Sequence, residues 1–216
     1  GDGISWSDAD NWSSDSVPGS GSDVVIDVNA DSAFSIEVNQ EQTVENLDLT
    51  SRDANLVLNS DLNVTSDYYQ NFSTLSGSAD LIVDGTLFFD NGLMSGSGST
   101  IANSGGQFDS GILDERRFVV ASRQTLRKTK SIDGKNGAVL EIEPNATFRN
   151  ENYRNMSVTS DSDSHPSIIN HGLITTTLGN ESTIKWSVEN HGTIRADADN
   201  HIQLGGQIID SGGTYQ

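Results

Sequence analysis

A 20-residue period in the C-terminal third constrains the fold of this chain more than any other feature. Two of its repeats are almost identical, Asn170-His171-Gly172 and Asn190-His191-Gly192. Four polar residues recur at this interval: Asn150, Asn170, Asn190 and Asp210. The residues two positions after them are Asn152, Gly172, Gly192 and Gly212. A fixed period of this length is typical of repeat proteins, whose units are too small to bury an apolar face alone and stack on their neighbours.

Composition favours a thin stack of coils over a thick globular core. Only 33% of the 216 residues are hydrophobic and 21 are glycine, which would by itself suggest disorder, yet short apolar runs recur along the chain. About ten coils of 20 residues, stacked at the roughly 4.8 Å spacing of strands, would form a rod about 45 to 50 Å long. The absence of cysteine excludes disulfides and thiolate metal sites.

Charge is distributed very unevenly. Residues 1–115 hold 20 acidic residues and a single basic one, Arg52, which sum to −19. The chain has 31 acidic and 12 basic residues in all, so residues 116–216 carry equal numbers of each. A block this acidic repels nucleic acid and anionic membrane surfaces and attracts divalent cations. We therefore expect no nucleic-acid partner, and because no run of 18 apolar residues occurs, we expect no membrane insertion.

The N-terminal residues 1–30 predict a cap over one end of the stack. Trp6 and Trp12 precede a Val-Pro-Gly turn at 17–19, and residues 24–28 form a β-branched strand. This arrangement resembles the opening module of large bacterial secreted and cell-surface β-solenoid proteins, of the adhesin or autotransporter-passenger kind. The chain starts at Gly1 with no charged or apolar leader and stops at Gln216 with no amphipathic cap, so we expect an excised segment of something longer.

The same resemblance extends through much of the chain. Residues 81–87 and 92–98 are similar to the degenerate L-x-V-x-G-T-L and G-x-x-S-G-x-G coils of those proteins, with alternating residues inward and glycine at the corners. The resemblance implies one right-handed parallel β-helix over residues 1–216. It also implies an extracellular chain, secreted or on the cell surface, in which such segments act as stalks, adhesive surfaces or scaffolds.

Residues 112–137 break this rhythm and are predicted to form an irregular basic insert. The basic residues of the segment are Arg116, Arg117, Arg123, Arg127, Lys128, Lys130 and Lys135. Polysaccharide-cleaving β-helix enzymes place such cations beside carboxylates that bind calcium, so Arg116, Arg117, Arg123 and Lys128 are candidate ligand-binding residues. Two other interpretations stay open: a solvated insert that pairs with the acidic coils, and a patch that docks another copy.

Three Asp-x-Asp pairs in predicted loops are candidate calcium ligands: Asp8 with Asp10, Asp161 with Asp163, and Asp197 with Asp199. Calcium prefers several hard oxygen ligands, which acidic loops can supply together with backbone carbonyls. None of the pairs belongs to a complete calcium-loop motif, so each is equally described as a solvated acidic turn. Calcium is the one candidate cofactor.

Aromatic pairs offer a surface for sugar rings. Adjacent residues of a strand point to opposite faces, so one member of Tyr68-Tyr69 and one of Phe88-Phe89 should face outward. We expect Tyr69 and Phe89 to be the ligand-binding members, although packing in the core or at corners would also explain them.

The repeated asparagines and histidines have two interpretations. Stacked asparagines hydrogen-bond along the axis of a solenoid and satisfy polar groups at its corners. Alternatively, His171 and His191 lie on neighbouring rungs about 5 Å apart and share a transition metal. Since the sequence shows no third ligand in phase, the asparagine ladder is the better explanation.

These features together predict a non-enzymatic role. We expect a structural or adhesive segment of an extracellular bacterial protein, a rigid rod that presents its surface and has calcium as a candidate ligand. One alternative is a carbohydrate-binding module or a polysaccharide-active β-helix, with polysaccharide or matrix components as partners. Another is a self-associating subunit of an extracellular filament.

Overall fold

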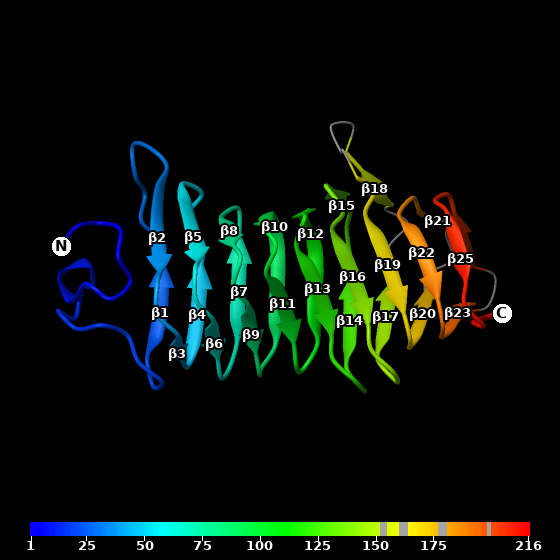
Figure 1. The fold of residues 1–216 in the computed structure, drawn as a ribbon, viewed down its shortest axis with the longest axis horizontal. Coiled ribbons are helices and arrows are strands. Elements are labelled where there is room, and N and C mark those ends of the chain that lie inside the picture. Colours follow the sequence, from blue (N-terminus) through cyan, green and yellow to red (C-terminus); the bar gives the residue numbers. More distant parts are fainter. Residues whose placement is uncertain (152–154, 160–163, 177–180, 198–199) are drawn as a thin grey trace.

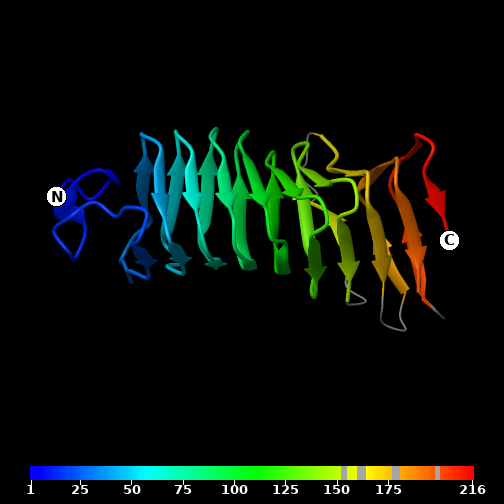
Figure 2. The same cartoon turned by 90° about the horizontal axis from the view of Figure 1, so that it is seen from below.

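The computed structural model is a parallel β-solenoid, as the sequence predicts. It describes residues 1–151, 155–159, 164–176, 181–197 and 200–216. Within these ranges a nine-stranded sheet contributes one strand to each of nine turns, and a 17-stranded sheet wraps the other two sides. Figures 1 and 2 show the turns stacked along the long axis, with the N-terminal loops at one end and the C-terminus at the other. We call the three sides face 1, face 2 and face 3, in chain order.

Face 1 begins each turn and contains ten parallel strand segments. They are β1 (Asp23–Ile26), β4 (Asn46–Leu49), β7 (Tyr68–Asn71), the first half of β10 (Leu87–Ser95), the first half of β12 (Gly106–Asp114), β14 (Thr125–Lys128), β17 (Thr147–Asn150), β20 (Leu173–Thr176), β23 (Thr193–Ala196) and β26 (Thr214–Tyr215). Because β10 and β12 continue around the corner, faces 1 and 2 join in the larger sheet.

Faces 2 and 3 complete each turn. Face 2 consists of β2 (Phe34–Val38), β5 (Ala54–Leu58), β8 (Thr74–Gly77), the second halves of β10 and β12, β15 (Ile132–Lys135), β18 (Met156–Val158), β21 (Glu181–Ile184) and β24 (His201–Leu204). Face 3 consists of β3 (Gln42–Val44), β6 (Leu62–Val64), β9 (Leu81–Val83), β11 (Ser99–Ala102), β13 (Arg117–Val120), β16 (Val139–Ile142), β19 (Ser167–Asn170), β22 (Ser187–Asn190) and β25 (Ile208–Asp210).

Residues 112–137 belong to two regular turns of the solenoid, which corrects the expectation of an irregular insert. Strands β13, β14 and β15 pair in register with the preceding and following turns on all three faces. The longer intervals lie further along, where Val139 pairs with Ser167 and Met156 with Ile184. The basic residues suggested an insert because charge is rare inside soluble proteins, but two of these cations, Arg116 and Lys128, are buried.

Of the four polar residues that recur every 20 positions, only three are partners in the structure. Asn170, Asn190 and Asp210 are partners on face 3, whereas Asn150 lies on face 1 between Lys128 and Thr176. The amide nitrogen Nδ2 of Asn170 donates to Oδ1 of Asn190 at 2.7 Å, so the predicted asparagine ladder is real over these two turns. The 20-residue spacing from Asn150 is a coincidence, because the turn that follows it is longer.

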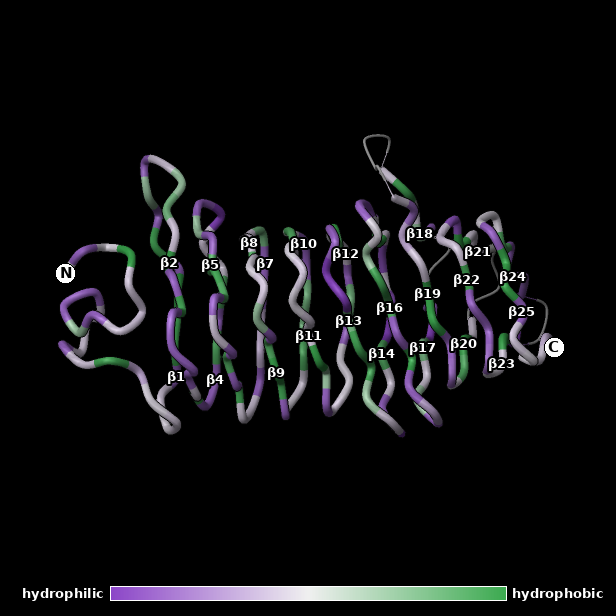
Figure 3. Tube along the Cα trace, viewed as in Figure 1, coloured by the Kyte–Doolittle hydropathy of each residue, from purple (hydrophilic) through white to green (hydrophobic). Residues whose placement is uncertain are grey.

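The core runs the length of the rod as columns of inward side chains. Strands alternate buried and more exposed residues, for example along β1, and Figure 3 shows hydrophobic and hydrophilic residues interspersed along the turns. Phe89 and Phe108 of consecutive turns pack edge to face with centroids 5.0 Å apart. Phe118, on face 3 of the same turn as Phe108, packs edge to face against it at 4.6 Å. Trp186 is fully buried and lies over Gly134, where a Cβ atom would come within 2.4 Å of the indole.

The N-terminal segment folds over the first turn around its two tryptophans. Trp6 is fully buried, and its ring packs edge to face against Trp12 at 4.8 Å. A short 3-10 helix, η1 (Ala9–Asn11), lies between them, and Trp12 Nε1 donates to the Trp6 carbonyl at 2.8 Å. Ser5 forms a parallel bridge with Glu37 of β2, so the segment covers part of the leading sheet edge. Within the described ranges, no helix has the length and apolarity to cross a membrane.

Candidate functional site

One outward column on face 1 brings together aromatic, amide and guanidinium side chains from five consecutive turns. The strand pairings place these residues on successive rungs: Tyr69, Phe88, Gln107, Arg127 and Arg149. Neighbouring rungs are about 4.8 Å apart, so the column extends about 19 Å along the rod axis. We call this set the face 1 column.

Phe88, rather than Phe89, is the outward aromatic residue of its pair. Phe88 is 37% exposed, while Phe89 is fully buried and lies between Gln70 and Phe108 in an inward column. Tyr69 is partly exposed, as expected, whereas Tyr68 is buried. The error was one of parity: Leu87 is inward, so the residue two positions later is inward as well.

The two arginines of the face 1 column share one carboxylate. Arg127 donates to Glu151 through Nε at 3.0 and 2.9 Å and through Nη2 at 2.6 Å, and Nη1 of Arg149 lies 4.0 Å from the same side chain. The side chains of Arg127 and Arg149 remain 51% and 45% exposed. The Glu151 carboxylate raises the pKa of Arg127. The pair therefore carries a net positive charge toward solvent.

Arg116 lies inside the solenoid, which corrects its assignment as a ligand-binding residue. Its side chain is fully buried, and Nε donates to Thr100 Oγ1 at 2.8 Å. Nη1 and Nη2 donate to four backbone carbonyls from earlier turns, those of Gly77, Ser95, Ala79 and Ser99. Burial lowers the pKa of Arg116 to about 10. The guanidinium thus connects three turns from within.

Lys128 is also buried rather than available to a ligand. Its Nζ donates to Oδ1 of Asn150, the in-register residue of the next turn, at 2.9 Å. Asn150 in turn donates to Oγ of Ser182. Loss of hydration lowers the pKa of Lys128 to about 8. Lys128 and Asn150 therefore form part of a polar column inside the C-terminal half.

The other two basic candidates are on the surface but apart from the face 1 column. Arg117 begins a face 3 strand and pairs with Glu141 of the next turn. Arg123 is exposed and occupies a corner with φ of 68°. The four basic candidates therefore do not converge on one site.

The described aspartates of the predicted calcium loops serve local structure. Asp8 caps η1, accepting from the backbone nitrogen of Asp10 at 3.1 Å and from that of Asp2 at 2.9 Å. Asp197 accepts from Arg195 Nε at 2.7 Å and from Thr175 Oγ1 at 3.1 Å. Asp161, Asp163 and Asp199 lie outside the described residues. In the described part of the chain, no three acidic or histidine side chains are grouped as a metal site, and the calcium expectation stays a prediction.

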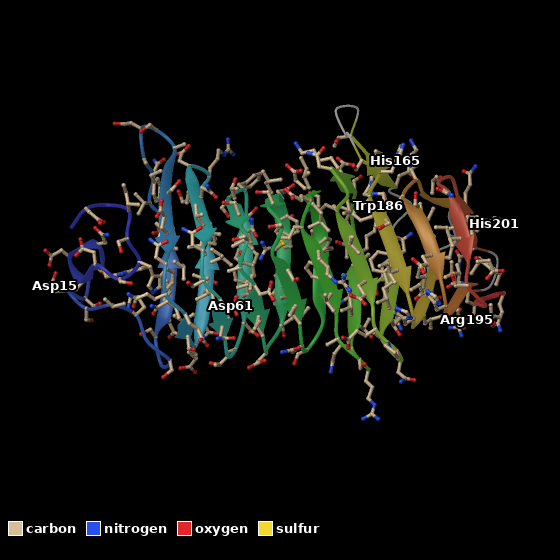
Figure 4. The ribbon with its side chains drawn as sticks, viewed as in Figure 1. Asp15, Asp61, His165, Trp186, Arg195 and His201 are labelled. Atoms are coloured by element: carbon tan, nitrogen blue, oxygen red, sulfur yellow. The ribbon has the colours of Figure 1, made fainter. Side chains whose placement is uncertain are left out.

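His171 and His191 stack at the corner that follows face 3. Their ring centroids are 4.7 Å apart and their planes differ by 16°, close to the separation expected from the sequence. His191 Nε2 lies 2.8 Å from Oε1 of Glu189. His165 and His201 lie elsewhere in the C-terminal part of the rod (Figure 4).

Sequence reasoning missed Phe88, Gln107 and Arg149. The parity of Leu87 was a usable signal for Phe88. Arg149 could not be placed above Arg127, because the interval between their turns departs from 20 residues. Comparison of the chain with protein-family models, with curated proteins and with solved structures gave no match. The geometry described above is therefore the basis for a functional proposal.

Proposed function

We propose that this chain is a rigid structural and adhesive segment of an extracellular bacterial protein, secreted or displayed on the cell surface. The observation that carries the proposal is the face 1 column, a row of aromatic, amide and guanidinium groups on successive turns of the solenoid. The role is non-enzymatic: the rod holds the column in a fixed geometry and presents it to a partner.

The proposed rigidity is supported by strand pairing and by a buried core that both extend along the rod. Parallel pairing runs from β1 to β26 on face 1 and from β3 to β25 on face 3. Fully buried side chains occur from Trp6 to Trp186. In such a stack each turn packs mainly against its neighbours, so stiffness comes from repetition of one interface.

A polysaccharide of the cell surface or matrix is the partner that the face 1 column fits best. Tyr69 and Phe88 offer apolar ring surface, and Gln107 can exchange hydrogen bonds with hydroxyl groups. Arg127 and Arg149 can donate paired hydrogen bonds to hydroxyl or carboxylate oxygens. The acidic first half favours neutral or sparsely charged chains over dense polyanions such as nucleic acid.

A glycan array with matched variants tests the proposal. We expect the wild-type chain to bind at least one polysaccharide, and Phe88→Ala or Tyr69→Ala to weaken that binding about tenfold, which corresponds to about 1.4 kcal/mol. Tyr215→Ala is the control, because Tyr215 is 45% exposed but belongs to the last turn, away from the column. If binding survives both column substitutions, the adhesive surface lies elsewhere. If no glycan binds, the adhesive part of the proposal is wrong.

A further inference from the structure

The corner after face 3 carries a pair of exposed histidines that the face 1 column does not use. His171 and His191 follow Asn170 and Asn190, which are in-register partners of neighbouring turns. The two rings lie one above the other, 4.7 Å apart and nearly parallel, and both residues are exposed. Two imidazoles held on adjacent rungs can donate nitrogen lone pairs to one ion.

The backbone beneath the histidines is fixed by the same repeat. Asn170 and Asn190 are fully buried and joined by the 2.7 Å amide hydrogen bond, and Asn170 Oδ1 also accepts from the Gly172 nitrogen at 3.2 Å. At Gly192 a Cβ atom would come within 2.2 Å of the Gly172 carbonyl oxygen, so only glycine allows this close stacking of the corners. The triplet thus directs asparagine inward and histidine outward at a defined separation.

Glu189 brings a carboxylate next to His191, a neighbour that the sequence did not reveal, although the three side chains are not already grouped as a metal site. It lies two residues before His191 on face 3, and its Oε1 is 2.8 Å from His191 Nε2. Its side chain is 40% exposed and that of His191 is 34% exposed, so the contact is open to solvent. Glu143 precedes His171 at the same corner in the previous turn, but its Oε2 accepts from the nitrogen and hydroxyl of Ser122.

We propose that His171 and His191, assisted by Glu189, bind a divalent transition-metal ion such as Zn²⁺ at this corner of the rod. Imidazole and carboxylate donors suit zinc or copper, whereas calcium prefers oxygen donors alone.

Small movements of the exposed side chains complete the site. Zinc bonds of about 2.0 to 2.1 Å to nitrogen and oxygen in tetrahedral geometry separate two donors by about 3.3 Å. The His191–Glu189 contact would therefore open by roughly 0.5 Å, and the histidine nitrogens would tilt toward each other. The three side chains leave a fourth position to water or to an external donor.

Isothermal titration of the tag-free chain with zinc chloride tests the site. We expect one saturable Zn²⁺ ion per chain, with affinity lowered about tenfold or more by His171→Ala and by His191→Ala. Glu189→Gln should weaken binding by a smaller factor, because it keeps both imidazoles. His201→Ala is the matched control, since it removes another exposed histidine, on face 2, and should leave the titration unchanged.

The outcomes separate cleanly, because the substituted side chains are exposed and should leave circular dichroism unaltered. Loss of the zinc titration in both histidine variants, with retention in His201→Ala, supports the proposal. It is overturned if wild type shows no stoichiometric binding, or if His171→Ala and His191→Ala bind zinc as tightly as wild type. Glycan binding is not involved, so this result is independent of the proposed adhesive function.

Discussion

Replacing Arg116 with methionine should lower the free energy of unfolding by about 3 to 5 kcal/mol. Methionine fills part of the space but donates no hydrogen bond, so the carbonyls that the guanidinium holds in the earlier turns lose a donor. Each buried polar group left without a partner costs about 1 to 3 kcal/mol. Part of this loss is offset, because the variant no longer desolvates a cation, whose cost is visible in the lowered pKa of Arg116.

Arg117→Met is the matched control for this prediction. Arg117 is the next residue, but its side chain is 44% exposed and its ion pair with Glu141 lies at the surface. Such pairs contribute about 0 to 1 kcal/mol. Urea unfolding of the two variants should therefore differ severalfold in the stability lost, and hydrogen exchange should localise the Arg116 effect to β8, β11 and β13. Equal losses would show that Arg116 does not hold the turns together.

The stability of the wild-type chain should rise with pH relative to Lys128→Met, by up to about 3 kcal/mol between pH 8 and 10.5. Burial lowers the pKa of Lys128 from 10.5 to about 8 in the folded chain. Below pH 8 both states hold the proton, and the folded state bears the cost of a buried cation. Between pH 8 and 10.5 the proton is bound in the unfolded state but not in the folded state, so raising the pH favours folding.

Denaturant unfolding of both proteins at a series of pH values measures this difference. Titration of other groups, Arg116 among them, is common to the two chains and cancels as long as the sites are independent. Lys185→Met, which removes an exposed lysine, controls for the loss of one positive charge. A flat difference for Lys128→Met would contradict the buried amine.

The period and the alternation of apolar residues were sufficient to predict the architecture. Corner glycines and β-branched runs constrain a chain locally, and the solenoid is built from such local choices repeated turn after turn. The inward position of Trp186 followed from its parity with Ile184 and Val188. The stacking of His171 on His191 followed because their turn is 20 residues long.

The positions that the sequence did not predict depend on the register between turns of unequal length. Asn150 was assigned to the wrong face, and Arg149 was not placed above Arg127, because neither turn has the 20-residue interval. Arg116 and Lys128 were expected at the surface, since an isolated cation is costly to bury. Their burial is explained by the neighbouring turns, whose carbonyl and amide oxygens accept their hydrogen bonds.

The face 1 column is the basis of the functional account, and a disulfide tests it directly, because the natural chain contains no cysteine. Residues on adjacent rungs have Cα atoms about 4.8 Å apart, within the range that a disulfide spans, whereas residues two rungs apart exceed about 7 Å. Tyr69→Cys combined with Phe88→Cys should close under mild oxidation, and Tyr69→Cys combined with Gln107→Cys should keep two free thiols, as counted by alkylation and mass spectrometry. Free thiols in the first pair, or a bridge in the second, would contradict the register that builds the column.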